Sequence, residues 1–317
     1  MPELPEVETV VKELRPKLKN KKIKEVRVLL SKMVAMGPST LSNLRKTDES
    51  VAIKFSKALK GQKITDLKRR AKLIIIDLAG KPARHASQGV AGGFAVLIHL
   101  KMTGQLIYFS KKELGKQIRL LNLENYQPVR LPAKSTHVIF EFMDGSRLFY
   151  NDFRQFGYLK LVTDKELPFV KELQGYGPEP LEKDFTYQRF EQLLKRRQAA
   201  QVKPWLMDPT IIAGIGNIYS DEIAYFAKVR PTRTIKSLND KEKKLLYKGI
   251  QKVLNEAVEH YGSSVGDFVR PSGDWGTYGL LHKVYGRAGE KCKTCKTIIK
   301  SLKFNGRTGS FCPNCQK

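Results

Sequence analysis

The sequence predicts an α+β protein of several domains: an N-terminal helix leading into a β-sandwich, a helical region, and a small C-terminal module. Three observations support this order. Short apolar runs separated by Gly, Pro and Asn extend from residue 23 to about residue 162, which is typical of a sandwich. Beyond residue 180 the apolar residues recur at helical spacing, and all four cysteines lie near the C-terminus. A chain of 317 residues is long enough for two domains and a small appendage.

The first domain is predicted to open with a helix over residues 3–18. Its apolar residues Val7, Val11, Leu14 and Leu18 recur at helical spacing, and glutamates occupy the first turn, where the helix dipole favours them. Strands are predicted at residues 23–30, 73–78, 94–100, 137–142 and 158–162. A Gly-rich stretch at 82–93 and a polar, basic stretch at 111–136 interrupt this rhythm, and we expect both to be surface insertions.

The second half of the chain is predicted to be mainly helical. Residues 167–180 are rich in Pro and Gly, which predicts a linker. Helices are predicted after it at 185–200, 218–227 and 240–260, and the Gly-rich stretch 263–279 is expected to be a mobile loop. The expected division is therefore a β-sandwich domain at 1–165, a linker at 166–182, a helical domain at 183–286 and the C-terminal module at 287–317.

The charge balance indicates a polyanionic partner. The chain holds 58 Lys and Arg against 31 Asp and Glu, a formal net charge of +27. An excess of positive charge this large opposes compaction of the chain. The usual partners of a protein with such a charge are nucleic acid or an anionic membrane surface. The apolar stretches are far shorter than the roughly 20 residues of a membrane-spanning helix, and no secretory signal opens the chain. We therefore expect a cytoplasmic protein without a membrane partner, and since no symmetry suggests an oligomer, a monomer.

The C-terminal module carries the pattern of a metal site. Cys292, Cys295, Cys312 and Cys315 form two C-x-x-C pairs. Each pair can form a turn that directs two sulfurs inward, and two such turns complete a tetrahedral shell. Four thiolates without histidine suit a closed structural site, so we expect one structural Zn²⁺, with a β-hairpin that projects residues 305–308 outward. The alternative, two redox-active dithiols, agrees less well with the basic surroundings.

The chain start combines a proline with a glutamate. A small second residue favours removal of Met1, which would leave Pro2 as a secondary amine. An α-amino group has a pKa of about 8, so a useful fraction is an unprotonated nucleophile at neutral pH. Such an amine attacking a sugar C1′ gives an iminium ion, an electron sink for elimination, and Glu3 lies beside it to shuttle protons. On spacing alone, Pro and Glu as ordinary first-turn residues are the simpler interpretation.

This start and a series of later stretches resemble the bacterial formamidopyrimidine-DNA glycosylase family. The matching stretches are 1–9 (MPELPEVET), 69–72 (RRAK), 99–104 (HLKMTG), 152–157 (DFRQFG), 177–180 (GPEP), 203–208 (KPWLMD), 214–219 (GIGNIY), 285–287 (YGR) and the cysteine module. As an ordered set they are highly specific and span nearly the whole chain. The resemblance implies a β-sandwich catalytic domain, a helix–two-turn–helix DNA-binding domain and a zinc ribbon. It also implies removal of oxidised purines from damaged double-stranded DNA, followed by strand cleavage.

The resemblance assigns catalytic roles at four matching positions. It implies that Pro2 is the nucleophile that forms a Schiff base and that Glu3 is the general acid/base that helps open the deoxyribose. Lys72 matches the lysine near the lesion phosphates that donates a proton in β-elimination; a solvated lysine at a strand start is the alternative. Arg307 matches the arginine that grips phosphates flanking the lesion and is assigned to δ-elimination.

Three further positions match the family's void-filling residues: Met102, Arg154 and Phe156. An enzyme that acts on a base takes it out of the stack. Apolar side chains unstack a duplex, and an arginine can hydrogen-bond the orphaned partner base. Met102 and Phe156 would otherwise be interpreted as core residues, but the neighbouring Gly104 and Gly157 favour loop tips.

A glycine-rich turn and nearby cations are candidate phosphate contacts. Gly214 and Gly216 would let the backbone approach a phosphate, and Asn217 can cap the following helix, whose N-terminus favours an anion. Lys203 and Arg197, the last residue of a Lys-Arg-Arg run, could neutralise phosphates. A plain turn and a solvated helix face are the alternatives.

The chain departs from the family pattern at three polar positions. Gln155 replaces a common basic residue, Ser135 stands where many members have a histidine, and Gln198 falls within the basic run. Three functions stay open: a bifunctional glycosylase and abasic-site lyase for oxidised purines, an endonuclease VIII-like glycosylase for oxidised pyrimidines, and a non-catalytic protein that binds damaged DNA. Leu4 and the Val-Glu-Thr continuation favour the first function, and intact Pro2 and Glu3 count against the third.

Overall fold

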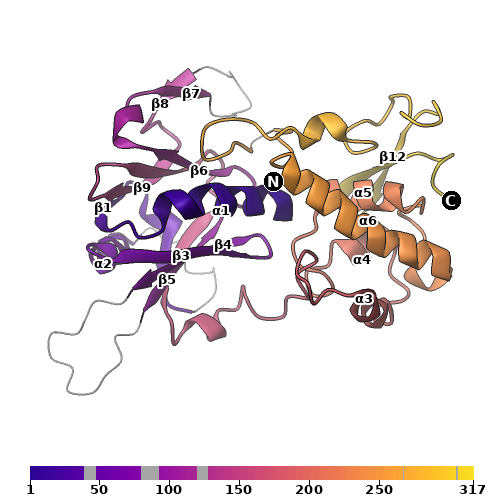
Figure 1. Cartoon of the computed structure of the whole chain (residues 1–317), viewed down its shortest axis with the longest axis horizontal. Helices are drawn as coiled ribbons and strands as arrows, with labels where there is room; N and C mark the ends of the chain where they lie inside the picture. The colour runs from indigo at the N-terminus through magenta and orange to yellow at the C-terminus, as the bar shows by residue number, and fades with distance from the viewer. Residues whose placement is uncertain (39–47, 80–92, 120–127, 267, 305) are drawn as a thin grey trace. The chain divides into compact units, whose positions relative to one another are not determined.

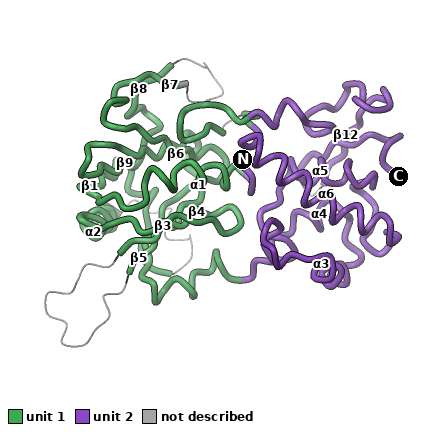
Figure 2. Tube along the Cα trace, in the orientation of Figure 1, with its two compact units in different colours: residues 1–2, 6–174, 264–276 green, residues 3–5, 175–263, 277–317 purple. Residues whose placement is uncertain are grey.

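The computed structural model describes residues 1–38, 48–79, 93–119, 128–266, 268–304 and 306–317. It divides into two compact units, each assembled from separate segments of the chain (Figure 2). Unit 1 holds residues 1–2, 6–174 and 264–276, and unit 2 holds residues 3–5, 175–263 and 277–317. The four-part division made from the sequence stays a prediction. The predicted insertion at 82–93 lies outside the described residues except for Gly93. None of the helices described has the length and apolar character needed to cross a membrane.

Unit 1 is a sandwich of two sheets, as predicted (Figure 1). One sheet has the strand order β1-β9-β10-β6 and the other β2-β11-β5-β4-β3. Their strands are β1 (Ile23–Val28), β2 (Val34–Met36), β3 (Lys63–Arg70), β4 (Leu73–Ala79), β5 (Phe94–His99), β6 (Gly104–Phe109), β9 (Thr136–Phe142), β10 (Arg147–Asp152) and β11 (Tyr158–Thr163). Apolar side chains from both sheets share one buried core. Burial of that apolar surface holds the two layers together.

Two helices belong to this sandwich. Helix α1 (Leu4–Leu18) agrees with the predicted helix, and its predicted apolar stripe is buried in the core of the sandwich. Helix α2 (Glu49–Leu59) was not predicted. It begins after Asp48, whose carboxylate accepts hydrogen bonds from the backbone N–H groups of Ser50 and Val51, and it buries Phe55. An N-cap aspartate of this kind is a local signal for a helix start that the strand rhythm concealed.

The predicted insertion at 111–136 contains regular structure. It holds the 3₁₀ helix η3 (Lys111–Glu113) and an antiparallel pair, β7 (Gln117–Arg119) with β8 (Pro128–Arg130). Ile118 and Leu131 join Phe109 and Phe149 in a second, smaller core. The described parts of this stretch therefore include an antiparallel strand pair with its own buried contacts.

The stretch 263–279, expected to be a mobile loop, is packed where it is described. Phe268 contributes to the main core of unit 1, and Val269 to the smaller core. The Arg270 guanidinium pairs with the Glu13 carboxylate of α1, with Nε and Oε1 2.5 Å apart. Sequence composition predicted the polar, Gly-rich character of this stretch but not these contacts.

Unit 2 combines helices with a two-stranded ribbon. Its helices are α3 (Tyr187–Leu194), α4 (Val202–Leu206), α5 (Asn217–Phe226) and α6 (Asp240–Glu259), and the ribbon is β12 (Lys300–Phe304) with β13 (Arg307–Phe311). The helix predicted at 185–200 ends earlier because Arg197 has a positive φ of 52°, which an α-helix does not accommodate. The other two helices follow the prediction closely, and Asn239 and Glu242 form a capping box at the start of α6.

Candidate active site and metal centre

The carboxylate of Glu3 is held at the N-terminus of α5 within unit 2. Its Oε2 accepts from the backbone N–H of Gly216 at 2.8 Å, and its Oε1 accepts from that of Ile218 at 2.9 Å. A longer bond of 3.4 Å comes from Tyr219. The side chain is 1% exposed. These amides have no partner inside the helix, and the helix dipole favours a negative charge there. Glu3 is therefore fixed as an acceptor in one position.

The glycine-rich turn before α5 admits the start of the chain. The backbone N–H of Leu4 donates to the carbonyl of Gly214 at 3.0 Å. Gly214 has a φ of +85°, and a Cβ built there would lie 2.8 Å from the Leu4 side chain. A glycine is required for both reasons. The close approach predicted for a phosphate is thus made, in this structure, by Leu4.

The predicted capping role of Asn217 is wrong. Gly216 is the N-cap residue, and Asn217 is the first residue of α5. The amides that a capping side chain would satisfy already donate to Glu3. The Oδ1 of Asn217 is buried and has no hydrogen-bond partner among the described residues. Asn217 therefore stays a candidate for contact with a ligand, as the sequence predicted. The contact would use its side-chain oxygen, and not a role as the helix cap.

Pro2 and Lys72 belong to unit 1. Pro2 is buried and follows Met1, whose side chain is 44% exposed. Lys72 is partly exposed and lies in the turn that joins β3 to β4, next to Ala71, which has a φ of 53°. The Arg69 guanidinium fixes this turn: it donates to the carbonyl of Ala71 at 3.0 Å and to the Glu8 carboxylate of α1 at 2.8 Å. One ion pair thus connects the helix that carries the chain start with the turn that carries Lys72.

The three predicted void-filling residues of unit 1 lie together. An N–H of the Arg154 guanidinium is directed at the Met102 sulfur, with Nη1 and Sδ 3.2 Å apart. The guanidinium carbon lies 4.8 Å from the centroid of the Phe156 ring. Arg154 and Phe156 are exposed, the latter by 54%. A core residue seldom exposes its aromatic ring to solvent with a cation over one face. The same arrangement suits a side chain that is inserted between bases as a wedge.

A buried aspartate, which sequence reasoning missed, organises this group. Asp152 is fully buried; its Oδ2 accepts from the backbone N–H of Gly157 at 2.7 Å, and its Oδ1 accepts from the Thr103 hydroxyl. The Thr103 hydroxyl oxygen in turn accepts from the backbone N–H of Arg154 at 2.9 Å. A Cβ on Gly157 would lie 2.0 Å from the Tyr150 hydroxyl, so the turn requires glycine. Asp152 therefore links the two turns that carry Met102 and Phe156.

Lys203, predicted to contact phosphate, has a buried partner instead. Its side chain is 0% exposed, and its ammonium donates to Asp221 Oδ1 at 2.7 Å and to the Asn217 carbonyl at 3.0 Å. Burial lowers the pKa of Lys203 and raises that of Asp221 to about 6, in each case against the attraction of the partner. A wholly buried ammonium cannot meet a phosphate directly in this arrangement.

Arg197 and Arg307 reach the surface. The Arg197 side chain is 68% exposed and pairs with Asp208 at 2.5 Å. Arg307 is the first residue of β13 and is exposed together with Gly306 and Thr308, as predicted for the ribbon hairpin; Asn305 lies outside the described residues. Both arginines are placed where an anion could reach them.

Two adjacent acids of α5 that the sequence analysis did not single out connect it to the C-terminal part of unit 2. Asp221 Oδ2 accepts from the backbone N–H of Ser310 in β13 at 2.8 Å. Glu222 accepts from the backbone N–H groups of Lys283, Val284 and Tyr285 at 2.8 to 3.1 Å. Burial raises the pKa of Glu222, and these bonds oppose the rise. Two neighbouring acids in a helix whose residues are almost all buried were the available signal, but burial is not visible in the sequence.

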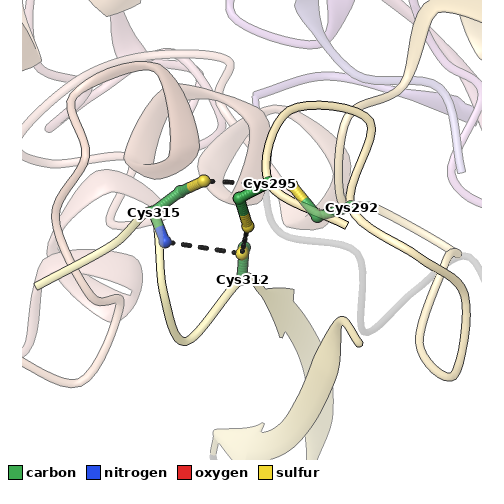
Figure 3. A group of neighbouring side chains, drawn as sticks. All are labelled: Cys292, Cys295, Cys312 and Cys315. Atoms are coloured by element: carbon green, nitrogen blue, oxygen red, sulfur yellow. Dashed lines mark hydrogen bonds between the residues drawn. The ribbon is translucent and has the colours of Figure 1, made fainter. Parts of the chain in front are cut away.

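The four cysteines gather into one group (Figure 3). Their four Sγ atoms all lie within 4.8 Å of one another, and Cys295 and Cys312 are 3.4 Å apart across the two turns. Sulfurs bound to one tetrahedral zinc at about 2.3 Å lie at similar separations. The donor set and its spacing therefore fit one structural zinc, which would connect the two turns without an open coordination position.

Comparisons with known proteins agree along the chain. Residues 1–159 match the formamidopyrimidine-DNA glycosylase N-terminal domain, residues 176–269 the formamidopyrimidine-DNA glycosylase H2TH domain, and residues 289–317 the zinc finger found in FPG and IleRS. Formamidopyrimidine-DNA glycosylase from Pelotomaculum thermopropionicum is 36% identical over 317 residues, covering 100% of this chain and 99% of the relative. The enzyme of that name from Listeria monocytogenes is also 36% identical over 317 residues, with 100% of each chain covered.

Solved structures give the same result. Lactococcus lactis Fpg in complex with DNA that contains an abasic site matches with a TM-score of 0.76 and 28% identity over 99% of each chain. Its complex with DNA that contains N7-benzyl-Fapy-dG matches with a TM-score of 0.77 and 29% identity over 100% of each chain. With these matches over its whole length, the chain belongs to the formamidopyrimidine-DNA glycosylase family.

Proposed function

We propose that this protein is a bifunctional DNA glycosylase and abasic-site lyase of base excision repair, which removes oxidised purines such as 8-oxoguanine and formamidopyrimidines. The glycosylase activity is that of its family; the lyase step and the substrates are the proposal. One observation carries it most directly: the Glu3 carboxylate, next in sequence to Pro2, is immobilised by three backbone N–H groups at the N-terminus of α5, one of them from the N-cap residue Gly216. A proton-transfer group held in one position beside a nucleophile is what this chemistry requires.

The proposed reaction begins once Met1 has been removed. The nitrogen of Pro2 attacks C1′ of the damaged nucleotide, a new C–N bond forms, and the bond from C1′ to the base breaks. The Glu3 carboxylate takes the proton that the attacking amine of Pro2 loses and passes it to the ring oxygen as the sugar opens, which leaves an iminium ion on Pro2. Loss of a proton from C2′ then expels the 3′ phosphate by β-elimination, and a second elimination expels the 5′ phosphate. The C1′–base bond leaves its electron pair on the base, the C1′–O4′ bond leaves its pair on the ring oxygen, and each C–O bond to phosphate leaves its pair on the departing phosphate oxygen. The electron pair of the C2′–H bond forms the new double bond.

Lys72 and Arg307 support these eliminations in the proposal. Lys72 lies in a turn fixed by the ion pair of Arg69 and Glu8, so its ammonium can donate a proton near the departing phosphate. Arg307 is exposed at the start of β13 and can bind the second phosphate through its guanidinium. Their assignment to the β- and δ-steps follows the family resemblance.

The substrate is proposed to be damaged duplex DNA in a bacterial cytoplasm. The net charge of +27 supports a polyanionic partner. The group of Met102, Arg154 and Phe156, of which the last two are exposed, offers a wedge for the hole that an extruded base leaves. Zinc holds the ribbon that carries Arg307. Affinity is expected to fall by about 0.9 log unit per log unit of salt for each phosphate neutralised.

Trapping with borohydride tests the nucleophile. The protein is incubated with duplex DNA containing an abasic site, and reduction should give a covalent adduct whose protein end maps to Pro2. Insertion of one serine between Met1 and Pro2 keeps every native side chain but converts the Pro2 amine into an amide, so no adduct should map to Pro2 in that variant. A Lys72→Ala variant serves as the control for capture by a lysine. A native adduct that maps to a residue other than Pro2, or a native protein that cleaves DNA with Met1 still attached, would refute the proposal.

A second substrate class has one supporting observation. Lactococcus lactis Fpg, which matches with a TM-score of 0.76 and 30% identity, has been solved in complex with DNA that contains an oxidised pyrimidine. Single-turnover excision from a panel of duplexes with one oxidised purine or one oxidised pyrimidine decides between the classes. Faster excision of the purines is the expected result.

A further inference from the structure

Helix α5 contacts the cysteine group at the end opposite to the one that binds Glu3. Tyr225 lies in its last turn, and its ring packs against the small core that contains Cys292 and Cys312. The Tyr225 hydroxyl oxygen lies 2.7 Å from Oγ1 of Thr294 and 3.5 Å from Sγ of Cys292. Both contacts lie within unit 2. A side chain from the helical part of this unit thus reaches one of the predicted zinc ligands.

The chemistry of a zinc ligand gives these two contacts a direction. A cysteine that binds zinc is a thiolate, which accepts hydrogen bonds and has no proton to donate. Both contacts are satisfied together when the Tyr225 hydroxyl donates to Cys292 and its oxygen accepts the proton of Thr294. Thr294 lies in the same C-x-x-C turn as Cys292. The two hydroxyl groups then form a short chain that begins and ends on one turn and passes through α5.

The charge of the metal group explains why such a donor is useful. Four thiolates with one Zn²⁺ leave a net charge of about −2. Cys292 and Cys312 are buried, so the protein has to supply the donors that water would supply at an exposed sulfur. The backbone N–H of Cys315 lies 3.4 Å from Sγ of Cys312 and donates to it. Tyr225 serves Cys292 in the corresponding way, and hydrogen bonds to a charged acceptor are the stronger kind.

A cavity of about 230 Å³ extends to this contact, and its lining includes Tyr225, Thr294 and Cys315. Cys295 and Cys315 are only half-buried. A water molecule takes about 30 Å³ in the liquid, so several waters fit into this space. Water and small chelators can therefore approach the cysteine group from this side. Because a chelator removes zinc by replacing one thiolate after another, each contact that holds a sulfur in place should slow the loss of the metal.

We propose that Tyr225 is a positioning residue of the zinc site, whose hydroxyl donates a hydrogen bond to the Cys292 thiolate and holds the first C-x-x-C turn on α5. Its effect is on retention of the metal and not on the number of ligands. Residues that hydrogen-bond a metal ligand typically contribute about 10–100-fold to metal affinity. The contact also connects the metal with the helix whose N-terminus binds Glu3. The proposal concerns the zinc site alone and does not depend on the lyase reaction or the substrate.

Competition for zinc with a metallochromic chelator tests the contribution to affinity. Tyr225→Phe removes the hydroxyl and keeps the ring, so it separates the hydrogen bond from packing. Tyr247→Phe is the matched control, because the Tyr247 hydroxyl donates to the carbonyl of Phe185 at 2.9 Å and its ring packs in the helical core of unit 2. The full-length Tyr225→Phe protein should bind zinc about 10–100-fold more weakly than the native protein. Tyr247→Phe should bind zinc as the native protein does.

Substitution of Co²⁺ for Zn²⁺ gives a readout that a change in packing alone would not move. The sulfur-to-cobalt charge-transfer absorption reports the electron density on the thiolates. Loss of a hydrogen bond to sulfur raises the energy of its lone pairs, so this band should move to longer wavelength in Tyr225→Phe. The ligand-field bands should keep the pattern of four sulfur ligands. Thr294→Val removes the other hydroxyl of the chain and should give a smaller shift in the same direction, because Tyr225 then donates less strongly.

The two measurements together decide the proposal. Weaker zinc binding with a shifted charge-transfer band in Tyr225→Phe, and neither change in Tyr247→Phe, is the expected result. An unchanged band would overturn the proposal even if zinc binding were weaker, because Tyr225 would then act through packing and not through its hydroxyl. Unchanged zinc affinity would overturn it as well. If Tyr225→Phe does not fold, Thr294→Val tests the same chain of hydroxyl groups, and a native charge-transfer band in that variant would contradict the assignment.

Discussion

The two units place their candidate functional side chains in opposite environments. In unit 2, Glu3, Lys203 and Asp221 are at most 1% exposed and are bound by backbone amides and by one another. In unit 1, Arg154 and Phe156 reach solvent from a turn. This difference shows in which unit a change of function can be separated from a loss of stability. Exposed residues of unit 1 can be changed with little loss of stability, whereas the buried charges of unit 2 contribute both to the fold and to the position of Glu3.

Unit 1 fixes the positions of its candidate functional side chains in a different way. Asp152 is buried, but the side chains that it positions are not. Lys101, which precedes Met102, and Gln155, which follows Arg154, have φ values of 50° and 56°. These values lie in the left-handed region that non-glycine residues seldom adopt. The sandwich therefore supports tight turns, and these turns carry the exposed side chains. In unit 2 the charged groups are themselves the connections between segments.

Removal of zinc should give the largest difference between the units. Structural zinc contributes about 10–16 kcal/mol in small zinc-binding peptides, and among the described residues the one cluster able to hold a metal ion is the cysteine group of unit 2. After chelation, amide protons of residues 287–317 should lose their protection from exchange, while β5 and β11 of unit 1 should keep theirs. Hydrogen exchange with mass spectrometry measures both units at once. Equal loss in the two units would show that the comparison is wrong.

Cys312→Ser provides the genetic control for this experiment. It should reproduce the exchange pattern of the chelated protein without chelator, and added zinc should not restore protection. DNA affinity should fall in both samples because the ribbon carries Arg307. Unchanged affinity after loss of the metal would show that the ribbon is not a DNA contact.

Lys203 and Arg197 can be compared directly, because the sequence predicted a phosphate contact for each of these two cations. Lys203→Met removes one partner of a buried ion pair, so the free energy of unfolding should fall by about 3–5 kcal/mol. Arg197→Met removes an exposed partner of Asp208 and should cost less than about 1 kcal/mol. Urea denaturation of the two variants measures both values. A Lys203→Met protein as stable as the Arg197→Met protein would contradict the burial that separates them.

These cases also show how far the sequence could predict the molecule. The zinc site was predictable because its spacing is local: each C-x-x-C turn lies within one short stretch. The α1 helix and its apolar stripe were predictable for the same reason. The partner of Glu3 was not, because Gly216 lies 213 positions away along the chain. For Lys203, charge and proximity to a family motif predicted a phosphate contact, and only packing against Gly309 and Asp221 reveals a buried pair.

Acid should destabilise unit 1 through His99. His99 is partly exposed, but burial, with the nearby charges of Lys101 and Lys72, lowers its pKa to about 3. Its Nδ1 also accepts a 3.0 Å hydrogen bond from the backbone N–H of Lys101, which a protonated ring could not do. The unfolded chain binds a proton below about pH 6.5 that the folded chain does not, so stability falls as the pH falls from there to about 3.

The measurement is the free energy of unfolding in urea at pH 7 and pH 5. The native protein should lose about 1–2 kcal/mol from this residue over that interval, a value reduced by the partial exposure of the ring. His99→Gln should show a flatter pH dependence by that amount, since glutamine does not titrate. Protonation of the zinc thiolates is common to both proteins and cancels in the difference. An identical pH dependence in the two would exclude a depressed pKa at His99.

The smallest effect on stability is expected at the exposed wedge of unit 1, and there the comparison between the units is most discriminating. Phe156 is 54% exposed, so Phe156→Ala should change the free energy of unfolding by no more than about 0.5 kcal/mol. Phe149→Ala, at a side chain 1% exposed in the same sandwich, should cost about 3–5 kcal/mol. If the wedge works as proposed, excision from a lesion duplex should nevertheless slow markedly in Phe156→Ala. A variant with normal stability and normal excision would remove Phe156 from the site, and one with a large loss of stability would place it in the core.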